Sequence, residues 1–566
     1  MRRIPKLVRV IAVVGALSLV ASACGDDGET GGTDTTTTDG DTTDGTDSAM
    51  GDPDGIVQAD VVEPRSLITT HAGESEGITV LKALCRGLTY LDNEGNLANL
   101  VAADISTEDN VVWTVTLNEG WTFHDGSALD AQDYVDTWNF GADPRNGQQN
   151  NGFYNIIEGY PELNPEDPDG AEGPQEAPEP TVDSLTGLEV IDELTFQVTL
   201  TGPNTTFPLR LPYAAYYAMP SEVVTGGEEA VNAFNEEPIC NGPYRMDGPW
   251  QHEVVINTVS YEDYAGPDAP ANGGVTFNIV TDSTTAWQEL VAGNLSVSNV
   301  PPEFLEQAQS EFETAGRFAQ QPSDSFTYMG FPVYDEQFAN PELRQALSMA
   351  VDRQLIVDTI LSGNAEVAHS WIAPIIPGHR ENPCSELGTT ELDLEAATAK
   401  FDAAGGFEGT MTLWVNAGNE TAEQWVTAIG NMWKNAFGIE FEIEQLPFAE
   451  YLELYYGKTL TGPFRLGWGM DYPHPQNYLE PLYGTVDGYT GYSSAEFDAA
   501  LAAGNAEAEL DAAIPHYQQA EDLLCTDMPV IPLYFGVTTY AWNDTVDNVV
   551  LDGYGDFEWT QFVVTA

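Results

Sequence analysis

One acidic residue near the C-terminal end, Asp471, stands among aromatic residues and prolines in the stretch WGMDYPHPQNYL at residues 468–479. Burying a carboxylate in apolar surroundings is costly unless it is paired with a positive charge and hydrogen-bonded. Asp471 is therefore a candidate for binding a cationic group. His474, between two prolines in the same stretch, is a second candidate, as a ligand contact or a metal donor.

The local motifs of several enzyme classes are absent from the sequence, which contains no GxSxG, HExxH, GxxxxGK[ST] or GxGxxG. His124 and Asp125 precede Gly126, and this composition is typical of a turn. The chain has seven histidines, and none lies at helical ligand spacing from another. We therefore expect no enzymatic activity, no metal site built by the protein and no cofactor.

The N-terminal residues have the pattern of an export signal. Basic residues precede an apolar stretch at residues 11–20, which is too short to span a bilayer as a helix. Small residues lead to Cys24, as in a bacterial lipobox, although Ala21 stands where a leucine is usual. We expect a signal peptide at 1–23 and lipidation of Cys24, with ordinary secretion as the alternative. Residues 24–55 contain almost no apolar side chains and predict a disordered acidic stalk.

The composition is strongly acidic, with 18 Lys and Arg against 90 Asp and Glu and a formal net charge of −72. Nucleic acid and anionic lipid headgroups require a positive surface, so neither is an expected partner. An acid-rich surface adapted to saline surroundings and attraction of cationic solutes are both consistent with this charge. Apart from Cys24 the chain has four cysteines, which in an exported protein predict two disulfides with three possible pairings.

Helical and strand periodicities alternate along the chain from residue 56, which predicts α/β lobes. Alternation at 113–117 and a turn at 118–120 predict a hairpin with a second short strand at 121–123. Asp130 is a predicted helix cap, and residues 340–363 predict one long helix that begins at Pro341. A length of 566 residues exceeds what one hydrophobic core usually supports, so at least two lobes are expected.

Six blocks in order resemble the extracytoplasmic solute-binding proteins of peptide and nickel ABC importers, the dipeptide- and oligopeptide-binding family 5. The blocks are LCRGLTYLDNEGNLANLVA, WTVTLNEGWTFHDGSALDAQDYVDTW, CNGPYRM, LRQALSMAVDR, WGMDYPHPQNYL and DMPVIPLYFG. The resemblance extends from residue 56 to about residue 566. It implies an α/β fold that is periplasmic-binding-protein-like, type II, with two α/β lobes, an extra subdomain and a two-strand hinge that closes on solute.

The resemblance also implies a map of the lobes. Lobe I would comprise residues 56–85, 221–322 and 537–566, its subdomain residues 86–220, and lobe II residues 323–536. On this map Cys85 and Cys240 fall in one lobe, and Cys384 and Cys525 fall in the other. The resemblance therefore favours the pairs Cys85 with Cys240 and Cys384 with Cys525.

The function implied by the resemblance is capture of extended di- or oligopeptides for import by a membrane permease with cytoplasmic ATPases. Asp471 would bind the peptide amino terminus and Arg465 a peptide carboxylate. Two backbone edges, at residues 70–75 and 465–469, would pair with the peptide main chain. The ligand-binding residues implied in this way, pocket walls included, are Asp471, Arg465, Trp468, Gly467, Gly469, Tyr472, Gly73, Ser75 and Tyr154.

The expected location is the outer face of the cytoplasmic membrane, with the membrane reached through the lipid anchor alone and the protein a monomer. Three alternatives remain open from the sequence. One is an oligosaccharide or a chelated metal as solute, since the same fold binds different ligands. The others are a sensory or adhesion lipoprotein that feeds no transporter, and an enzyme.

Overall fold

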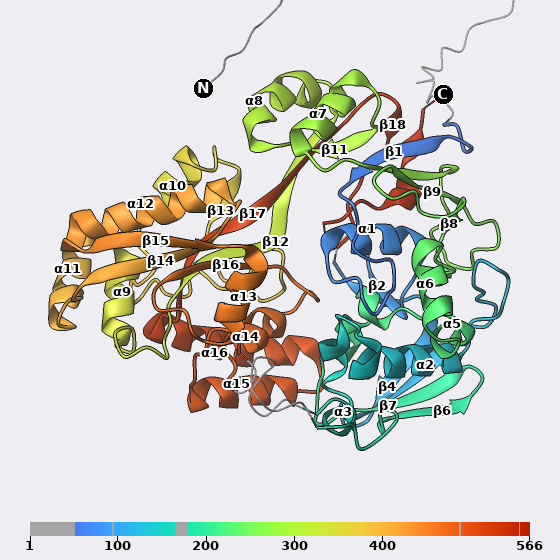
Figure 1. Cartoon of the computed structure of the whole chain (residues 1–566), viewed down its shortest axis with the longest axis horizontal. Coiled ribbons are helices and arrows are strands. Elements are labelled where there is room, and N and C mark those ends of the chain that lie inside the picture. Colours follow the sequence, from blue (N-terminus) through green and yellow to red (C-terminus); the bar gives the residue numbers. More distant parts are fainter. Residues whose placement is uncertain (1–50, 93–94, 166–177, 486–487, 554, 566) are drawn as a thin grey trace, which may run out of the picture. The chain divides into compact units, whose positions relative to one another are not determined.

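The part of the chain that the computed structural model describes is residues 51–92, 95–165, 178–485, 488–553 and 555–565 (Figure 1). The predicted signal peptide at 1–23, the lipidation site Cys24 and most of the stalk at 24–55 lie outside these residues. Regular structure begins with β1 (Ile56–Val61), and strands alternate with helices up to the C-terminal end. The predicted α/β class is confirmed.

The largest sheet contains seven strands in the order β11-β17-β12-β16-β14-β15, with β13 paired to β17. These strands are β11 (Val297–Asn299), β12 (Phe318–Gly330), β13 (Ala365–Val367), β14 (Thr410–Asn416), β15 (Glu440–Leu446), β16 (Phe464–Trp468) and β17 (Val530–Trp542). The two longest, β12 and β17, lie side by side and pair antiparallel (Figure 1). Their register shifts between Pro322 and Phe326, so each strand has two differently paired halves.

Smaller sheets build the remainder of the described chain. One has the order β1-β10-β9-β8 and another the order β4-β5-β7-β6, while β2 pairs with β3 and β18 with β19. The strands are β2 (Thr89–Leu91), β3 (Leu97–Asn99), β4 (Ala102–Thr107), β5 (Val112–Leu117), β6 (Leu188–Asp192), β7 (Thr195–Thr199), β8 (Tyr244–Met246), β9 (Val255–Ser260), β10 (Gly274–Ile279), β18 (Val546–Asp547) and β19 (Val563–Val564).

Buried hydrophobic residues form several separate clusters, and each has its own helices. One cluster lies around β1 and includes residues of α1 (Ser75–Leu84), α5 (Ser221–Thr225) and α6 (Glu228–Glu236). A second, around β5 and β7, includes α2 (Ala131–Ala142), α3 (Tyr160–Leu163) and α4 (Phe207–Arg210). A third, small cluster joins α7 (Ser283–Ala292) to α8 (Leu305–Ala308).

The largest cluster contains buried residues between Phe326 and Phe535. Its helices are α9 (Pro341–Met349), α10 (Arg353–Thr359), α11 (Leu394–Ala403), α12 (Glu420–Phe437), α13 (Phe448–Tyr456), α14 (Pro475–Tyr483), α15 (Ala495–Asn505) and α16 (Leu510–Asp527). β12 and β17 contribute to more than one cluster, because Phe326 and Phe535 lie in the largest one whereas Tyr540 lies in the cluster around β1.

Two of the predicted elements differ from the structure. The predicted hairpin at 113–123 is wrong, because β5 pairs with β4 and β7 and Thr122 bridges to Ala128 instead. The single helix predicted for 340–363 is divided into α9 and α10. Asp352 accepts a hydrogen bond from the backbone N–H of Leu355 and so caps a new helix, which stops α9 from continuing.

The predicted cap Asp130 is confirmed. Its side chain accepts from the backbone N–H groups of Gln132 and Asp133, and the Asp133 carboxylate accepts from the Asp130 N–H. This reciprocal pair satisfies N–H groups that the first turn of α2 would otherwise leave without partners.

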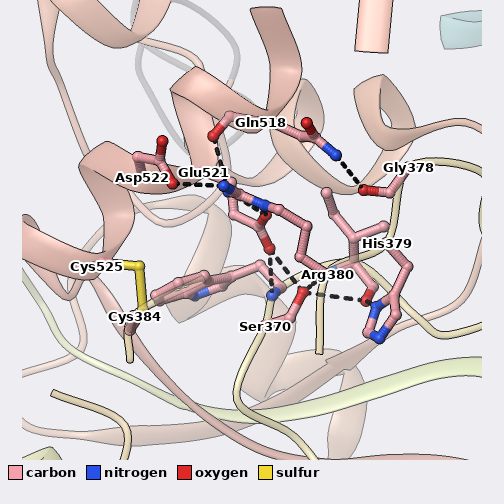
Figure 2. Close-up of polar contacts among 11 residues, drawn as sticks. Ser370, Gly378, His379, Arg380, Cys384, Gln518, Glu521, Asp522 and Cys525 are labelled. Carbon is pink, nitrogen blue, oxygen red and sulfur yellow. Dashed lines mark hydrogen bonds and ion pairs between the residues drawn. A yellow bond between two sulfur atoms is a disulfide. The ribbon is translucent and has the colours of Figure 1, made fainter. Parts of the chain in front are cut away.

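A buried carboxylate on α16, Glu521, ties the irregular segment at residues 370–380 to this helix (Figure 2). Glu521 is fully buried and accepts hydrogen bonds from the Ser370 hydroxyl at 2.6 Å and from Arg380 Nη2 at 2.7 Å. One turn later on α16, Cys525 is bonded to Cys384, and a second disulfide joins Cys85 to Cys240. The ion pair and the Cys384–Cys525 disulfide together hold residues 370–384 against α16 (Figure 2).

Candidate functional site

Asp471 lies in the loop that connects β16 to α14. The loop begins after Trp468, where β16 ends, and closes at His474, whose ring Nδ1 accepts from the backbone N–H of Gln476 at 3.3 Å. Pro475 occupies the first helical position of α14, where its missing N–H costs nothing. His474 is buried, and desolvation lowers its pKa to about 3, so its neutral ring serves as a helix cap.

The Asp471 carboxylate is held by one side chain, that of Asn477. Asn477 Nδ2 donates to Asp471 Oδ2 at 2.8 Å, and Asn477 Oδ1 accepts from the Asp471 backbone N–H at 2.8 Å. Within the described part of the chain, Asp471 Oδ1 accepts no hydrogen bond. Asp471 is half-buried, so this oxygen remains available to another group.

Burial raises the pKa of the Asp471 carboxyl to about 6, because removal from water disfavours its ionised form. The hydrogen bond from Asn477 and the positive charge of Arg210 oppose this rise, and the negative charge of Asp324 adds to it. The carboxylate is therefore ionised at neutral pH at a cost in free energy. A cation bound at Oδ1 would lower that cost.

Arg210, at the end of α4, brings a positive charge to this loop from a distant part of the sequence. Its Nη2 donates to the Tyr472 hydroxyl at 3.1 Å, and its guanidinium carbon lies 4.8 Å from the centre of the Tyr472 ring. Arg210 Nε is buried, and no group in the described residues accepts a hydrogen bond from it. Arg210 was not predicted from the sequence, although an arginine inside the apolar run FPLRLPYAAYY was a signal.

Asp324, in the irregular part of β12, approaches the same loop. Its Oδ2 accepts from the backbone N–H of Met470 at 2.8 Å, and its carbonyl oxygen accepts from the Tyr478 hydroxyl at 2.5 Å. Desolvation raises the pKa of the Asp324 carboxyl. No local pattern in the sequence indicated Asp324, because only the pairing of β12 with β16 brings it to this place.

Arg465 and Gly467 lie on β16, and Gly469 follows it. The Arg465 carbonyl accepts from the Tyr451 hydroxyl at 2.5 Å, and its Nη1 donates to Asn416 Oδ1 at 3.0 Å. Arg465 Nε is buried, and no described residue accepts from it. The groups that surround Asp471 are Asn477, Arg210 and Asp324, so the predicted arginine, Arg465, has a separate environment beside Asn416.

The two aromatic residues predicted beside Asp471 have different surroundings. Trp468 is half-buried, and its indole N–H donates to Asn477 Oδ1 at 3.3 Å, so Trp468 and Asp471 share one partner. Tyr472 is buried, and its hydroxyl donates to Gln476 Oε1 at 3.1 Å while accepting from Arg210. Trp468 thus remains partly open to solvent next to Asp471, whereas Tyr472 is part of a buried polar network.

The other predicted residues come from the first third of the chain. Gly73 and Ser75 are exposed, Ser75 begins α1, and residues 70–75 form a turn and a short irregular segment instead of a strand. Asn150 explains this shape, because its backbone N–H donates to the Thr70 carbonyl and its Nδ2 donates to the Ala72 carbonyl. Tyr154 is fully buried, and its hydroxyl donates to the Ala215 carbonyl at 2.5 Å.

The described residues contain no group of three or more His, Cys, Asp or Glu side chains arranged to hold a metal ion. Within the same residues no helix has the length and apolar character needed to cross a membrane.

A cavity of about 490 Å³ is lined by residues that include Lys82, Arg86 and Trp559, and none of the residues predicted for the site lines it.

Comparison with known proteins identifies relatives over most of the chain. The sequence profile of the family "Bacterial extracellular solute-binding proteins, family 5 Middle" matches residues 96–490. The oligopeptide-binding protein OppA of Bacillus subtilis is 22% identical, and the match covers 87% of this chain and 90% of that protein. The periplasmic murein peptide-binding protein MppA of Escherichia coli is 25% identical, over 83% of this chain and 86% of MppA.

Solved structures share the fold. The unliganded open form of the murein tripeptide-binding protein MppA matches with a TM-score of 0.74 at 21% identity, covering 91% of this chain and 98% of that one. OppA of Haemophilus influenzae, solved in complex with the peptide RPPGFSPFR, matches with a TM-score of 0.71 at 20% identity, over 91% and 100% of the two chains. The predicted periplasmic-binding-protein-like fold is confirmed.

Proposed function

Because the chain belongs to the bacterial extracellular solute-binding proteins of family 5, we propose that it captures extended di- or oligopeptides for an ABC importer. The family is one of solute-binding proteins and not of enzymes. Several curated relatives are named as oligopeptide-, dipeptide- or murein peptide-binding proteins, which supports a peptide as the solute. The hinge strands would be β12 and β17, and closure around them would enclose the peptide.

The observation that carries this proposal is the unsatisfied oxygen of Asp471. A half-buried carboxylate with a raised pKa, one oxygen held by Asn477 and the other without a donor, is suited to a positively charged group. The ammonium group at a peptide's amino terminus is such a group. Trp468, fixed beside Asp471 by the same amide, would form a wall for the first side chain.

The edge of β16 supports contacts to the peptide main chain. The Arg465 carbonyl points away from β12, since it accepts from Tyr451 instead of a ladder partner. Gly467, two residues later, directs its N–H and C=O the same way. The pairing of β14 with β16 reaches only Phe464, so the edge at Gly467 is open for an added strand. Gly469 would extend this edge toward Asp471.

The remaining predicted contacts belong to the same proposal. Arg465, whose Nε has no acceptor among the described residues, would meet a carboxylate of the peptide. Gly73 and Ser75, both exposed, would contact the peptide from the turn before α1. Tyr154 would stabilise the pocket wall through the core beneath it, because its hydroxyl and ring are buried there.

We further propose that residues 56–85, 221–322 and 537–566 form lobe I, residues 86–220 its subdomain and residues 323–536 lobe II. The separate buried clusters support this map, and so does the register shift of β12 next to residue 322. After cleavage of residues 1–23, a lipid on Cys24 would hold the protein at the outer face of the cytoplasmic membrane as a monomer. There it would deliver peptides to a permease.

Calorimetry with a free tripeptide and its N-acetylated form tests the proposal. Acetylation removes the positive charge of the amino terminus, so the acetylated peptide should bind at least about a hundredfold more weakly if Asp471 binds the ammonium group. Equal affinity of the two forms would refute this assignment. Native mass spectrometry of the purified protein provides an independent test, because a retained sugar or metal chelate in place of a peptide would refute the solute class.

A further inference from the structure

The side-chain amide of Asn477 makes three hydrogen bonds that connect Asp471 and Trp468. Asn477 is 1% exposed, and it belongs to the first turn of α14. Oδ1 accepts from two donors, the Asp471 backbone N–H at 2.8 Å and the Trp468 indole N–H at 3.3 Å. Nδ2 donates to Asp471 Oδ2 at 2.8 Å. One amide thus contacts both the acidic side chain and the aromatic side chain.

The orientation of this amide is fixed by its partners. A backbone N–H and an indole N–H are donors only, so the atom between them has to be the oxygen of Asn477. Nδ2 then necessarily faces the Asp471 carboxyl group, which accepts more strongly when it is ionised. The amide therefore favours the charged form of Asp471 and selects one of its two oxygens as a partner.

This choice of oxygen matters because a carboxylate rotates easily about its terminal torsion, where the energy wells are broad. A donor fixed in the core and bound to Oδ2 holds the rotation at one setting. Oδ1 is then the oxygen left for another group, and Trp468 is held close by. Ionised aspartate has no donor, and serine carries its donor and acceptors on one oxygen, whereas asparagine presents an acceptor and a donor on two separate atoms.

We propose that Asn477 is the positioning residue of the peptide site. It determines that Oδ1 of Asp471 meets the peptide's ammonium group, and it holds that oxygen and the Trp468 indole in one fixed arrangement. The inference rests on the proposed function, in which Asp471 binds the amino terminus. Asn477 itself does not touch the peptide, because its amide groups are occupied within the protein.

The test compares N477A with a matched control, N505A. Asn505 Oδ1 also accepts two hydrogen bonds, from Gln476 Nε2 at 2.8 Å and from the Tyr517 hydroxyl at 2.5 Å, and it does not contact Asp471. Calorimetry with a free tripeptide is run from pH 4.5 to pH 7, where the peptide amine stays charged. N477A should weaken binding by about ten- to a hundredfold at pH 7, as expected for loss of a hydrogen bond to a charged group.

The pH profile separates positioning from loss of structure. Without the donor on Oδ2, the pKa of Asp471 rises above about 6, so affinity in N477A should begin to fall at a higher pH than in the wild type. N505A should keep the wild-type midpoint whatever it costs in stability. A wild-type midpoint and wild-type affinity in N477A would overturn the proposal.

A measurement on the unaltered protein covers the case in which N477A does not fold. In protein labelled with nitrogen-15 at asparagine, the side-chain amide signal that is lost in N477D identifies Asn477. That signal should titrate with the midpoint of Asp471, and a signal that does not respond between pH 4.5 and pH 7 would overturn the proposal. This readout needs no peptide, so failure of peptide binding and failure of the Asn477 role are distinguishable.

Discussion

Replacing Asp471 by asparagine should abolish peptide capture and yet stabilise the peptide-free protein. Burial raises the pKa of Asp471 from 3.8 to about 6, so the ionised carboxylate destabilises the fold at neutral pH. A difference of about two pKa units corresponds to about 3 kcal/mol. Because Asp471 is only half-buried and solvent screens its charge, we expect a stabilisation of about 1 to 2 kcal/mol in D471N.

The sign of the pH dependence follows from the direction of this shift. A raised folded-state pKa means that the ionisation penalty is fully present above about pH 6, shrinks as the pH falls toward the unfolded value of 3.8, and disappears below it, where the carboxyl is protonated in both states. The extra stability of D471N should therefore be present at pH 7 and be mostly lost near pH 4. Asparagine keeps an oxygen that can accept from Asn477, so the hydrogen bond at Oδ2 has a substitute.

Thermal unfolding measures this difference, with and without peptide. For a chain of this size, 1 to 2 kcal/mol corresponds to roughly 1 to 2 °C in Tm. D471N should melt above the wild type at pH 7 without peptide, and only the wild type should be stabilised further by a free tripeptide. A lower Tm for D471N at pH 7, or a Tm difference at pH 4 as large as the one at pH 7, would refute the reasoning.

Three other predictions follow from the same structure. E521A should destabilise the protein by about 2 to 4 kcal/mol in urea unfolding, because Arg380 loses its buried partner. D522A removes the exposed partner of Arg380 and should lower the free energy of unfolding by under about 1 kcal/mol. Equal losses in the two variants would contradict this. R210M removes a positive charge that lowers the pKa of Asp471, so on acidification peptide affinity should begin to fall at a higher pH than in the wild type. An unchanged midpoint of this affinity profile would argue against an influence of Arg210 on Asp471. Intact-mass measurement should show a gain of about 4 Da on reduction of the two disulfides, and four free thiols before reduction would disprove them.

Local signals in the sequence predicted the elements whose ends depend on local chemistry. Asp130 was identified as a cap because a carboxylate before an apolar stripe is a local pattern, and the structure contains the complete capping box. The break between α9 and α10 was missed because Asp352, which caps α10, lies inside a stretch with helical periodicity, and a distant contact adds to this local signal. Arg353 Nε donates a hydrogen bond to the carbonyl of Pro532 on β17, and a contact this far along the chain cannot be predicted from helical periodicity.

The site shows the same division. Asp471 and Trp468 are three residues apart, and the apolar character around the acid was visible in the sequence. Arg210 and Asp324 reach the loop only through the packing of α4 against Tyr472 and the pairing of β12 with β16. Their contribution to the charge on Asp471 could therefore not be derived from neighbours in the chain.

The net charge of −72 and the single oxygen of Asp471 act on different properties of a solute. Charges spread over the surface attract every cation, but at physiological salt their influence decays within about 8 Å. They can raise the rate of encounter, but they do not distinguish a peptide's ammonium group from any other cation. Discrimination requires a partly desolvated acceptor in a fixed direction, which in the proposed site would be Asp471 Oδ1, because Asn477 holds Oδ2. Added salt should thus slow association while leaving the preference for a free over an acetylated amine largely intact.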